Sequence, residues 1–290
     1  MELKEKLLQS LFFISGISAI VILLAITAFI AATGVQFFQH VSITEIFSTD
    51  WDPTASPPGW GMLVLFAGTL YIAAIAMTIS IPAGLMLAIY MSEVASSAVR
   101  EYLKPAIESI AGIPTVVLGL FGIIFLAPFI SEIFNVPLAL NALNAGILVG
   151  FLAIPTIASI SEDVLAAIPR DFRFASEALG ATKWQTISRV VLPAGIGGIV
   201  AAIMLALGRV IGETMVVLMV AGNAKAMPHS IFDPVRPVTA NIAIELPETV
   251  VGDLHYQALF AQGLLLLLIT FVINLAADQV LERYRRRFGQ

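Results

Sequence analysis

The sequence lacks cysteine and has few charged residues. Of its 290 residues, 12% are Asp, Glu, Lys or Arg and 59% are hydrophobic, whereas a soluble globular chain has about 25% charged and 45–50% apolar residues. So few charges cannot cover a surface that faces water, and the mean hydropathy of +0.95 agrees. The absence of cysteine excludes disulfides and thiolate metal sites.

The residues that a hydrolase needs are also scarce. The three histidines, His40, His229 and His255, all lie outside the long apolar segments, where we interpret them as ordinary solvated loop residues. The chain has no His-Glu-x-x-His motif, no paired aspartates in an apolar segment and no P-loop. An intramembrane enzyme needs a nucleophile with a base, or a metal site. We therefore expect a non-enzymatic chain with no cofactor and no metal of its own.

Long apolar segments dominate what is present. A membrane-spanning helix needs about 20 mostly apolar residues, and we interpret six segments in this way. They are Leu11–Ala32, Leu63–Met91, Ala106–Ile130, Ala145–Ile160, Gly195–Ala221 and Ala258–Ala277. The first is too long for the apolar part of a secretory signal, so we interpret it as a retained anchor. The sequence predicts an all-α integral membrane protein with six transmembrane helices.

The basic residues predict the orientation, because Lys and Arg are enriched in cytoplasmic loops. With both termini in the cytoplasm, the inside segments hold 12 of the 15 basic residues. These are Lys4, Lys6, Arg100, Lys104, Arg170, Arg173, Lys183, Arg189, Arg283, Arg285, Arg286 and Arg287. The outside loops hold only Lys225 and Arg236, and Arg209 lies inside a span. We expect a multi-pass protein of the plasma or inner membrane with both termini inside.

The chain divides into three parts by composition. Residues 1–60 form an N-terminal tail, the first anchor helix and an outside loop. Residues 61–280 form a transmembrane domain with the other five spans, and residues 281–290 form a basic cytoplasmic tail. Such a tail is typical of a topology anchor at the anionic leaflet, and we expect no nucleic acid to bind it.

The inside segment between the fourth and fifth spans predicts two short helices. Pro169 suits a first helical turn, and Gly180 suits the left-handed residue after a helix end. Thr182 and Gln185 form a capping-box pattern that starts a second helix. Pro193 is then expected to break the chain before the fifth span. Small apolar residues on such a helix pair usually meet a partner, although a helix resting on the lipid surface has a similar pattern.

Here the spacing resembles that of a known family. Type-1 importer permeases of the ATP-binding-cassette class have Glu-Ala-Ala, three residues, Gly, nine residues and then Ile-x-Leu-Pro. The matching positions are Ala175, Ser176, Gly180, Val190, Leu192 and Pro193. The Glu of the motif falls on Phe174, and Glu177 lies one turn later on the same helix face. The resemblance implies a coupling helix near residues 169–183 that binds an ATPase subunit, and ATP hydrolysis in that separate chain.

The fifth predicted span holds an arginine, which is costly near the middle of a membrane. Glu213 follows Arg209 by four residues, hence on the same face of a continuous helix, and we expect the two to form an ion pair. One interpretation is that Arg209, Glu213 and Thr214 line a path for an anion, since Arg binds phosphate through paired donors. The alternative is a buried pair that only fixes helix register.

This stretch also resembles one branch of the family. Gly208-Arg209-x-x-Gly212-Glu213-Thr214-Met215, followed by Leu218-Met-Val-Ala-Gly-Asn223, is similar to the C-type permease subunit of phosphate importers. The resemblance implies four kinds of partner: a second, A-type permease, an ATPase dimer, an external phosphate-binding protein and the lipid bilayer. A permease for another oxyanion, such as sulfate or molybdate, is the alternative on substrate. A secondary anion transporter or channel would not explain the spacing around Gly180.

Overall fold

The computed structural model describes the backbone of residues 2–137 and 139–288, without the side chains of 2–7, 278, 280, 281 and 283–288. The predicted basic residues Lys4, Lys6, Arg283, Arg285, Arg286 and Arg287 therefore lie outside the described side chains. The elements in chain order are α1 (Glu2–Phe37), α2 (Ile43–Ile46), β1 (Trp51–Asp52), β2 (Gly59–Trp60), α3 (Leu63–Ile89), the π-helix η1 (Tyr90–Val94), α4 (Ser97–Ala111), α5 (Thr115–Phe121), the π-helix η2 (Gly122–Leu126), α6 (Ala127–Phe134), α7 (Ala142–Ala167), α8 (Arg170–Ala178), α9 (Lys183–Thr186), the π-helix η3 (Ile187–Val191), α10 (Leu192–Ile211), α11 (Met215–Val220), α12 (Val238–Glu245), the 3₁₀-helix η4 (Leu246–Glu248) and α13 (Leu254–Phe288).

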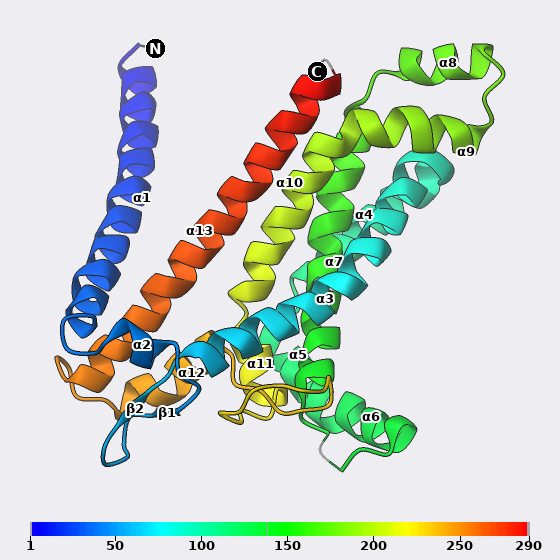
Figure 1. Ribbon diagram of the computed structural model, residues 1–290. Coiled ribbons are helices and arrows are strands. Elements are labelled where there is room, and N and C mark those ends of the chain that lie inside the picture. The colour runs from blue at the N-terminus through cyan, green and yellow to red at the C-terminus, as the bar shows by residue number, and fades with distance from the viewer. Residues whose placement is uncertain (1, 138, 289–290) are drawn as a thin grey trace.

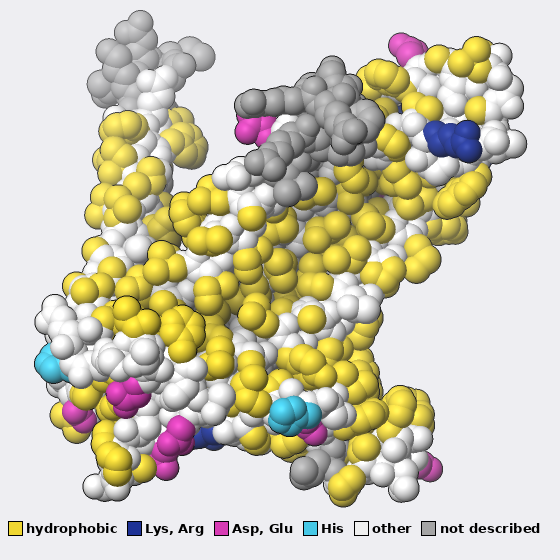
Figure 2. Space-filling view, viewed as in Figure 1, with side chains coloured by type: hydrophobic (Ala, Val, Ile, Leu, Met, Phe, Trp, Pro, Cys, Tyr) yellow, Lys and Arg dark blue, Asp and Glu magenta, His cyan; other side chains and the backbone are white. Residues whose placement is uncertain are grey.

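Both chain termini lie at the same end of the molecule as α8 and α9, which we name the α8 end (Figure 1). The opposite end, the α12 end, carries α12 and the two-residue strands β1 and β2, which pair antiparallel. Hydrophobic side chains cover much of the surface between the two ends, and Asp and Glu side chains gather at the α12 end (Figure 2).

Six helical segments of the described chain are long and apolar enough to cross a membrane, which confirms the predicted number. They are Leu8–Phe37, Leu63–Val94, Thr115–Phe134, Ala142–Ala167, Lys183–Ile211 and Leu254–Ala277. The second, third and fifth of these segments each include a π-helical turn, so each span runs through elements with separate labels.

Two of the predicted spans have wrong boundaries. The third span begins at Thr115 and not at Ala106, because the chain breaks at Gly112–Pro114. Pro114 has no N–H to donate and disfavours helical backbone in the residue before it. The fifth span ends at Ile211, and residues 212–214 form a turn before the short helix α11. The sequence pattern alone had joined α10 and α11 into one helix.

The centre of the fold is the contact between α3 and α7. Their buried faces are rich in small residues, and a Cβ added at Gly150 would come within 2.9 Å of the backbone oxygen of Ala76. Glycine at such a position lets two helix backbones approach closely, which is the usual way in which membrane helices pack. Helices α10 and α11 complete this core, and α1 packs against α13, where Phe29 meets Phe260 edge to face.

Pro193 does not break the chain before the fifth span, contrary to the prediction. Helix α9, η3 and α10 form one continuous helix from Lys183 to Ile211. The π-turn of η3 lets Leu192 N–H bond to the carbonyl of Ile187, five residues back. A π-turn is one of the known ways to insert a bend into a helix without ending it. Pro193 follows this turn directly, and the segment bends between α9 and α10 without ending (Figure 1), as helices typically do at a π-turn or a proline.

The α12 end is held by one buried glutamate. Glu245 accepts hydrogen bonds from Trp51 Nε1 at 3.0 Å, from Lys225 and Arg236 at 3.1 Å each, and lies 2.9 Å from His255 Nε2. The interpretation of His255 as a solvated loop residue is therefore wrong, since its side chain is only 17% exposed. Periodicity within one segment could not predict this contact, because the four partners come from three other segments of the chain.

Candidate functional site

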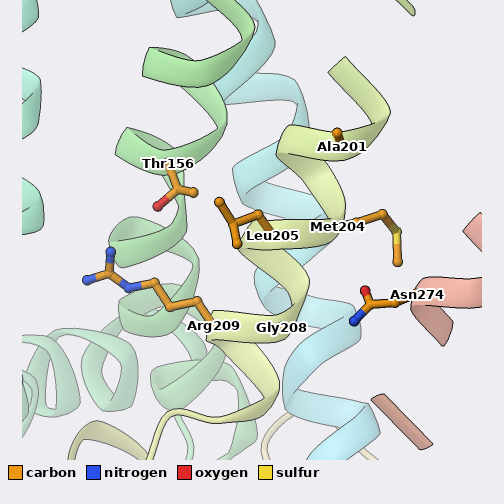
Figure 3. Close-up of a pocket in the computed structure, with 7 residues that line it drawn as sticks. All are labelled: Thr156, Ala201, Met204, Leu205, Gly208, Arg209 and Asn274. Carbon is orange, nitrogen blue, oxygen red and sulfur yellow. The ribbon is translucent and has the colours of Figure 1, made fainter. Parts of the chain in front are cut away.

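A groove of about 630 Å³ runs along α10 between α7 and α13 (Figure 3). Thr156 projects from α7, Asn274 projects from α13, and α10 forms the floor. We name this the α10 groove, lined by Thr156, Ala201, Met204, Leu205, Gly208, Arg209 and Asn274. A second hollow of about 430 Å³ shares Gly208 and Asn274 and continues along α13. The groove thus brings together three helices that are far apart in the sequence.

Arg209 lies in the last turn of α10 with its side chain partly buried. Its Nη2 donates a long hydrogen bond of 3.4 Å to the carbonyl of Ala111, at the end of α4. Within the described side chains, no carboxylate lies within ion-pair distance of this guanidinium. A cation in a membrane-crossing segment without a counter-ion is costly, and such residues typically mark a substrate or ion pathway.

The predicted ion pair between Arg209 and Glu213 is wrong. The same-face argument needs a continuous helix, but α10 ends at Ile211, so Glu213 leaves the helical path. Glu213 Oε1 instead accepts from the backbone N–H of Val216 at 3.2 Å and so caps α11. The hydroxyl of Thr239 donates to the Glu213 carbonyl at 2.8 Å. Glu213 therefore fixes the turn after α10.

Thr214 belongs to the same turn. Its hydroxyl donates to the carbonyl of Gly212 at 3.3 Å, and its side chain is partly buried. Neither Glu213 nor Thr214 lines the α10 groove, so the structure separates them from the Arg209 side chain that the sequence had grouped with them.

Two polar residues of the groove were missed from the sequence. No hydrogen-bond partner for the side chain of Thr156 or Asn274 is found within the described part of the chain. An amide or hydroxyl without a partner in lipid is unfavourable, so each is expected to face water, another subunit or a ligand. A lone Asn in the apolar run of the last span was a detectable signal, because such residues are rare and usually functional there.

The second candidate surface lies at the α8 end. Helix α8 and α9 meet at Gly180, whose φ of +85° confirms the predicted left-handed residue. The capping box of Thr182 and Gln185 is also present. The large apolar side chains Phe174, Leu179 and Trp184 are 61%, 89% and 66% exposed. These helices therefore present an apolar surface that faces away from the rest of the chain.

The other residues predicted for coupling divide between this surface and the interior. Ala175 and Glu177 are exposed on α8, while the hydroxyl of Ser176 lies 3.0 Å from that of Thr186 and links α8 to α9. Leu192 and Pro193 lie at the start of α10, where Leu192 packs against a small core between α3, α7 and α10. Leu192 and Pro193 thus belong to the helix that connects the α8 surface with the groove.

A family model matches residues 80–289, which is most of the chain. The family is described as the binding-protein-dependent transport system inner membrane component. This chain belongs to that family. It is therefore a transport component, a multi-pass permease of the inner membrane, and its expected family is confirmed.

Curated relatives agree with the family. The permease is 34% identical over 295 residues to the phosphate transport system permease protein PstC of Mesorhizobium japonicum, covering 95% of this chain and 89% of that protein. It is 35% identical over 254 residues to the "Probable ABC transporter permease protein YqgH" of Bacillus subtilis, covering 87% of this chain and 82% of the relative. Both alignments extend well beyond the short motifs from which the resemblance was inferred.

Solved structures show the fold. A bacterial alginate ABC transporter, solved in complex with a periplasmic protein that binds an alginate pentasaccharide, aligns with a TM-score of 0.68. The identity is 15%, and the alignment covers 99% of this chain and 96% of that chain. At this identity the comparison shows the architecture only, and it confirms the predicted fold of a type-1 ABC importer permease.

Proposed function

We propose that this permease forms half of the translocation path of an ATP-driven phosphate importer. The observation that carries the proposal is Arg209, a cation without a carboxylate partner that lines a groove between membrane-crossing helices. A negatively charged cargo is the natural partner of such a group. The name of the M. japonicum relative supports phosphate as that cargo.

The polar groups of the groove suit an oxyanion that keeps a proton. The guanidinium of Arg209 can donate two parallel hydrogen bonds to phosphate oxygens. The hydroxyl of Thr156, which lies on the same side of α10 as the guanidinium (Figure 3), can donate to a further oxygen or accept from a P–OH group, and Asn274 offers a second polar group on the opposite side of α10. Glu213 and Thr214 fix the turn beside Arg209 and so set where the path continues past α10.

The orientation follows from the charge bias together with the fold. Both termini lie at the α8 end, and the described basic residues of the loops concentrate there. The positive-inside rule therefore favours the α8 end as cytoplasmic and the α12 end as external.

Four partners follow from this arrangement. A second, PstA-like permease would close the open side of the α10 groove. Two ATP-binding-cassette subunits would bind, one on each permease, to the exposed apolar surface of α8 and α9, since such a surface is typical of an interaction site. An external phosphate-binding protein would deliver the cargo to the α12 end. ATP binding would draw the ATPase pair together and move α8, and the path would change the side to which it opens; this chain needs no cofactor of its own.

Reconstitution tests the proposal directly. The complete complex in lipid vesicles should take up labelled phosphate only with ATP and the binding protein. Arg209→Gln should lower uptake by at least about tenfold, because it removes the charge that offsets the cargo, while the amount of assembled complex stays the same. Arg189→Gln is the matched control, since Arg189 is exposed on the same continuous helix and does not line the groove.

The outcomes separate the alternatives. Normal uptake by Arg209→Gln would refute the role of the groove. Uptake of labelled sulfate or molybdate in preference to phosphate would identify another oxyanion importer. Uptake that persists without ATP would indicate a channel or a secondary transporter.

A further inference from the structure

A buried ion pair fastens α8 to the rest of the chain. Arg173, in the middle of α8, donates from Nε to both carboxylate oxygens of Glu93 at 3.2 Å and from Nη2 to Oε1 at 2.6 Å. The side chains are only 18% and 7% exposed. Glu93 lies in η1, the π-turn that ends the second span.

The same guanidinium also holds the end of α7. Its Nη1 donates to the carbonyl of Ile168 at 2.8 Å, and its Nη2 donates to the carbonyl of Leu165 at 2.9 Å. The last carbonyls of a helix have no partner within that helix, and a cation there also interacts favourably with the helix dipole. Arg173 therefore joins α8, η1 and the end of α7 at one point.

Few other polar contacts attach α8. Within the described residues, its remaining side-chain hydrogen bond to another element is the one between Ser176 and Thr186, which leads to α9. The outer face of α8 is exposed, and the neighbouring Arg170 has no ion-pair partner among the described side chains. The polar link between α8 and the end of α3 thus depends on the Glu93–Arg173 pair, and its polar link to the end of α7 depends on the two carbonyl bonds of the same Arg173.

We propose that Arg173 and Glu93 are positioning residues that make α8 move as one body with α3 and α7. The inference rests on the proposed function, in which an ATPase subunit moves α8. Thr156 lies on α7 and Arg209 lies on α10. A push on α8 would then reach one wall of the groove through Arg173, whose ion pair leads to α3 and whose carbonyl bonds lead to α7, while α9 carries it to the floor through the continuous helix from Lys183 to Ile211. The two routes together would change the width of the groove.

A hydrogen-bonded ion pair suits this role better than a role in stability. Burying two charges costs desolvation energy, so such a pair adds little net stability compared with apolar packing. Its several donors and acceptors fix the relative orientation of the groups, which an apolar contact does not do as strictly. Removing one partner leaves the other charge buried and lowers stability, so the transport per ATP of complex that has assembled is the measurement that separates coupling from folding.

The first test is a double-mutant cycle in the reconstituted complex. Glu93→Gln, Arg173→Gln and the double variant should each lower the phosphate transported per ATP hydrolysed by about tenfold, within the 5–150-fold range that is typical of coupling between sites. The double variant should be no worse than either single variant, because residues that act as a unit are not additive. Assembly, measured by copurification with the ATPase, should not change.

A matched control uses another buried carboxylate at the same end. Glu162 is fully buried and pairs with Arg100 and Lys104 of α4, without touching α8. Glu162→Gln should leave the transport per ATP unchanged even if it lowers thermal stability. An equal loss in this variant would mean that any buried charge at this end matters, and it would overturn the specific role of the pair.

The second test exploits the absence of cysteine from this chain. In Glu93→Cys/Arg173→Cys, a short bifunctional thiol reagent should restore the transport per ATP that the two substitutions remove, because it replaces the lost link. A cross-linked complex that binds and hydrolyses ATP but moves no phosphate would show that α8 must move relative to η1, and it would refute the inference. Failure of the unmodified complex to transport phosphate would instead refute the proposed function.

Discussion

The two ends of the molecule arrange their buried carboxylates differently. At the α12 end, Glu245 alone collects Trp51, Lys225, Arg236 and His255, which come from the first hairpin, the loop after α11 and the start of α13. At the α8 end, Glu93 and Glu162 each hold separate partners. A single centre locks several segments into one arrangement, whereas each separate pair fastens one helix to one neighbour, α4 to α7 through Glu162 and α8 to η1 through Glu93.

Arg209, which lies between the two ends, belongs to neither arrangement. No carboxylate of the described side chains pairs with it, and its described contact is one long hydrogen bond to a backbone carbonyl. Arg209 thus differs from the paired charges at both ends, because it lines a groove with no carboxylate beside it among the described side chains.

The largest effect should come from breaking the centre at the α12 end. Glu245→Gln leaves Arg236, which is only 15% exposed, without its counter-ion. Breaking a buried pair in this way costs about 3 kcal/mol. Thermal unfolding in detergent should show a clearly lower midpoint for Glu245→Gln. The control Glu248→Gln, whose carboxylate is exposed, should leave the midpoint unchanged. An unchanged midpoint for Glu245→Gln would contradict the idea of a single locking centre.

A smaller loss of folding stability is expected when a buried glutamate at the α8 end is replaced. Glu162→Gln should cost about 1–2 kcal/mol, because Arg100 and Lys104 are 38% and 28% exposed and can be hydrated. Lys104 also keeps Asp163 as a partner. The same unfolding measurement compares the two ends directly, and a loss larger than that of Glu245→Gln would reverse the comparison.

A substitution at Gly180 tests whether the exposed α8 surface binds the ATPase, and it changes no buried charge. The φ of +85° at Gly180 disfavours side chains with a Cβ, and a left-handed residue costs about 1–2 kcal/mol. Gly180→Val should therefore distort the corner between α8 and α9 and lower binding of the ATPase. Gly180→Asn is the control, since Asn tolerates this conformation. Equal ATPase binding by wild type and Gly180→Val would argue against the α8 surface as the docking site.

The smallest effect concerns pH at the α12 end. Burial raises the pKa of Glu245. Hydrogen bonds from His255, Lys225 and Trp51 together lower the pKa by more than burial raises it, so the pKa lies below its ordinary value. A lowered pKa means that the stabilisation is complete above the unfolded pKa of about 4.3 and disappears as the pH falls through the folded pKa. The difference in stability between wild type and Glu245→Gln should shrink below about pH 4. A constant difference down to pH 2 would contradict this assignment.

Local patterns predicted much of the fold from the sequence. The six spans follow from apolar length, and the corner at Gly180 with its capping box follows from residue types at fixed spacing. The ends of two spans were wrong because apolar length does not register a break such as Gly112–Pro114. The helix through Pro193 was missed because a π-turn has no simple residue signature.

The site was only partly predictable. Arg209 was identified because a cation within an apolar segment is conspicuous. Its supposed partner was wrong, because a same-face argument fails once the helix ends at Ile211. Thr156 and Asn274 line the same groove as Arg209 only because α7, α10 and α13 pack together. The role of Arg173 likewise depends on Glu93, which is 80 residues away in the chain.

The uninterrupted helix from Lys183 to Ile211 has a mechanical consequence. Its first turn lies beside the exposed corner at Gly180, and its last turn holds Arg209. The segment bends between α9 and α10 (Figure 1), where the π-turn η3 and Pro193 lie, but it does not end there. Because helix and not loop crosses this bend, a displacement of α9 outside the bilayer can be passed along α10 to the charge that its last turn carries.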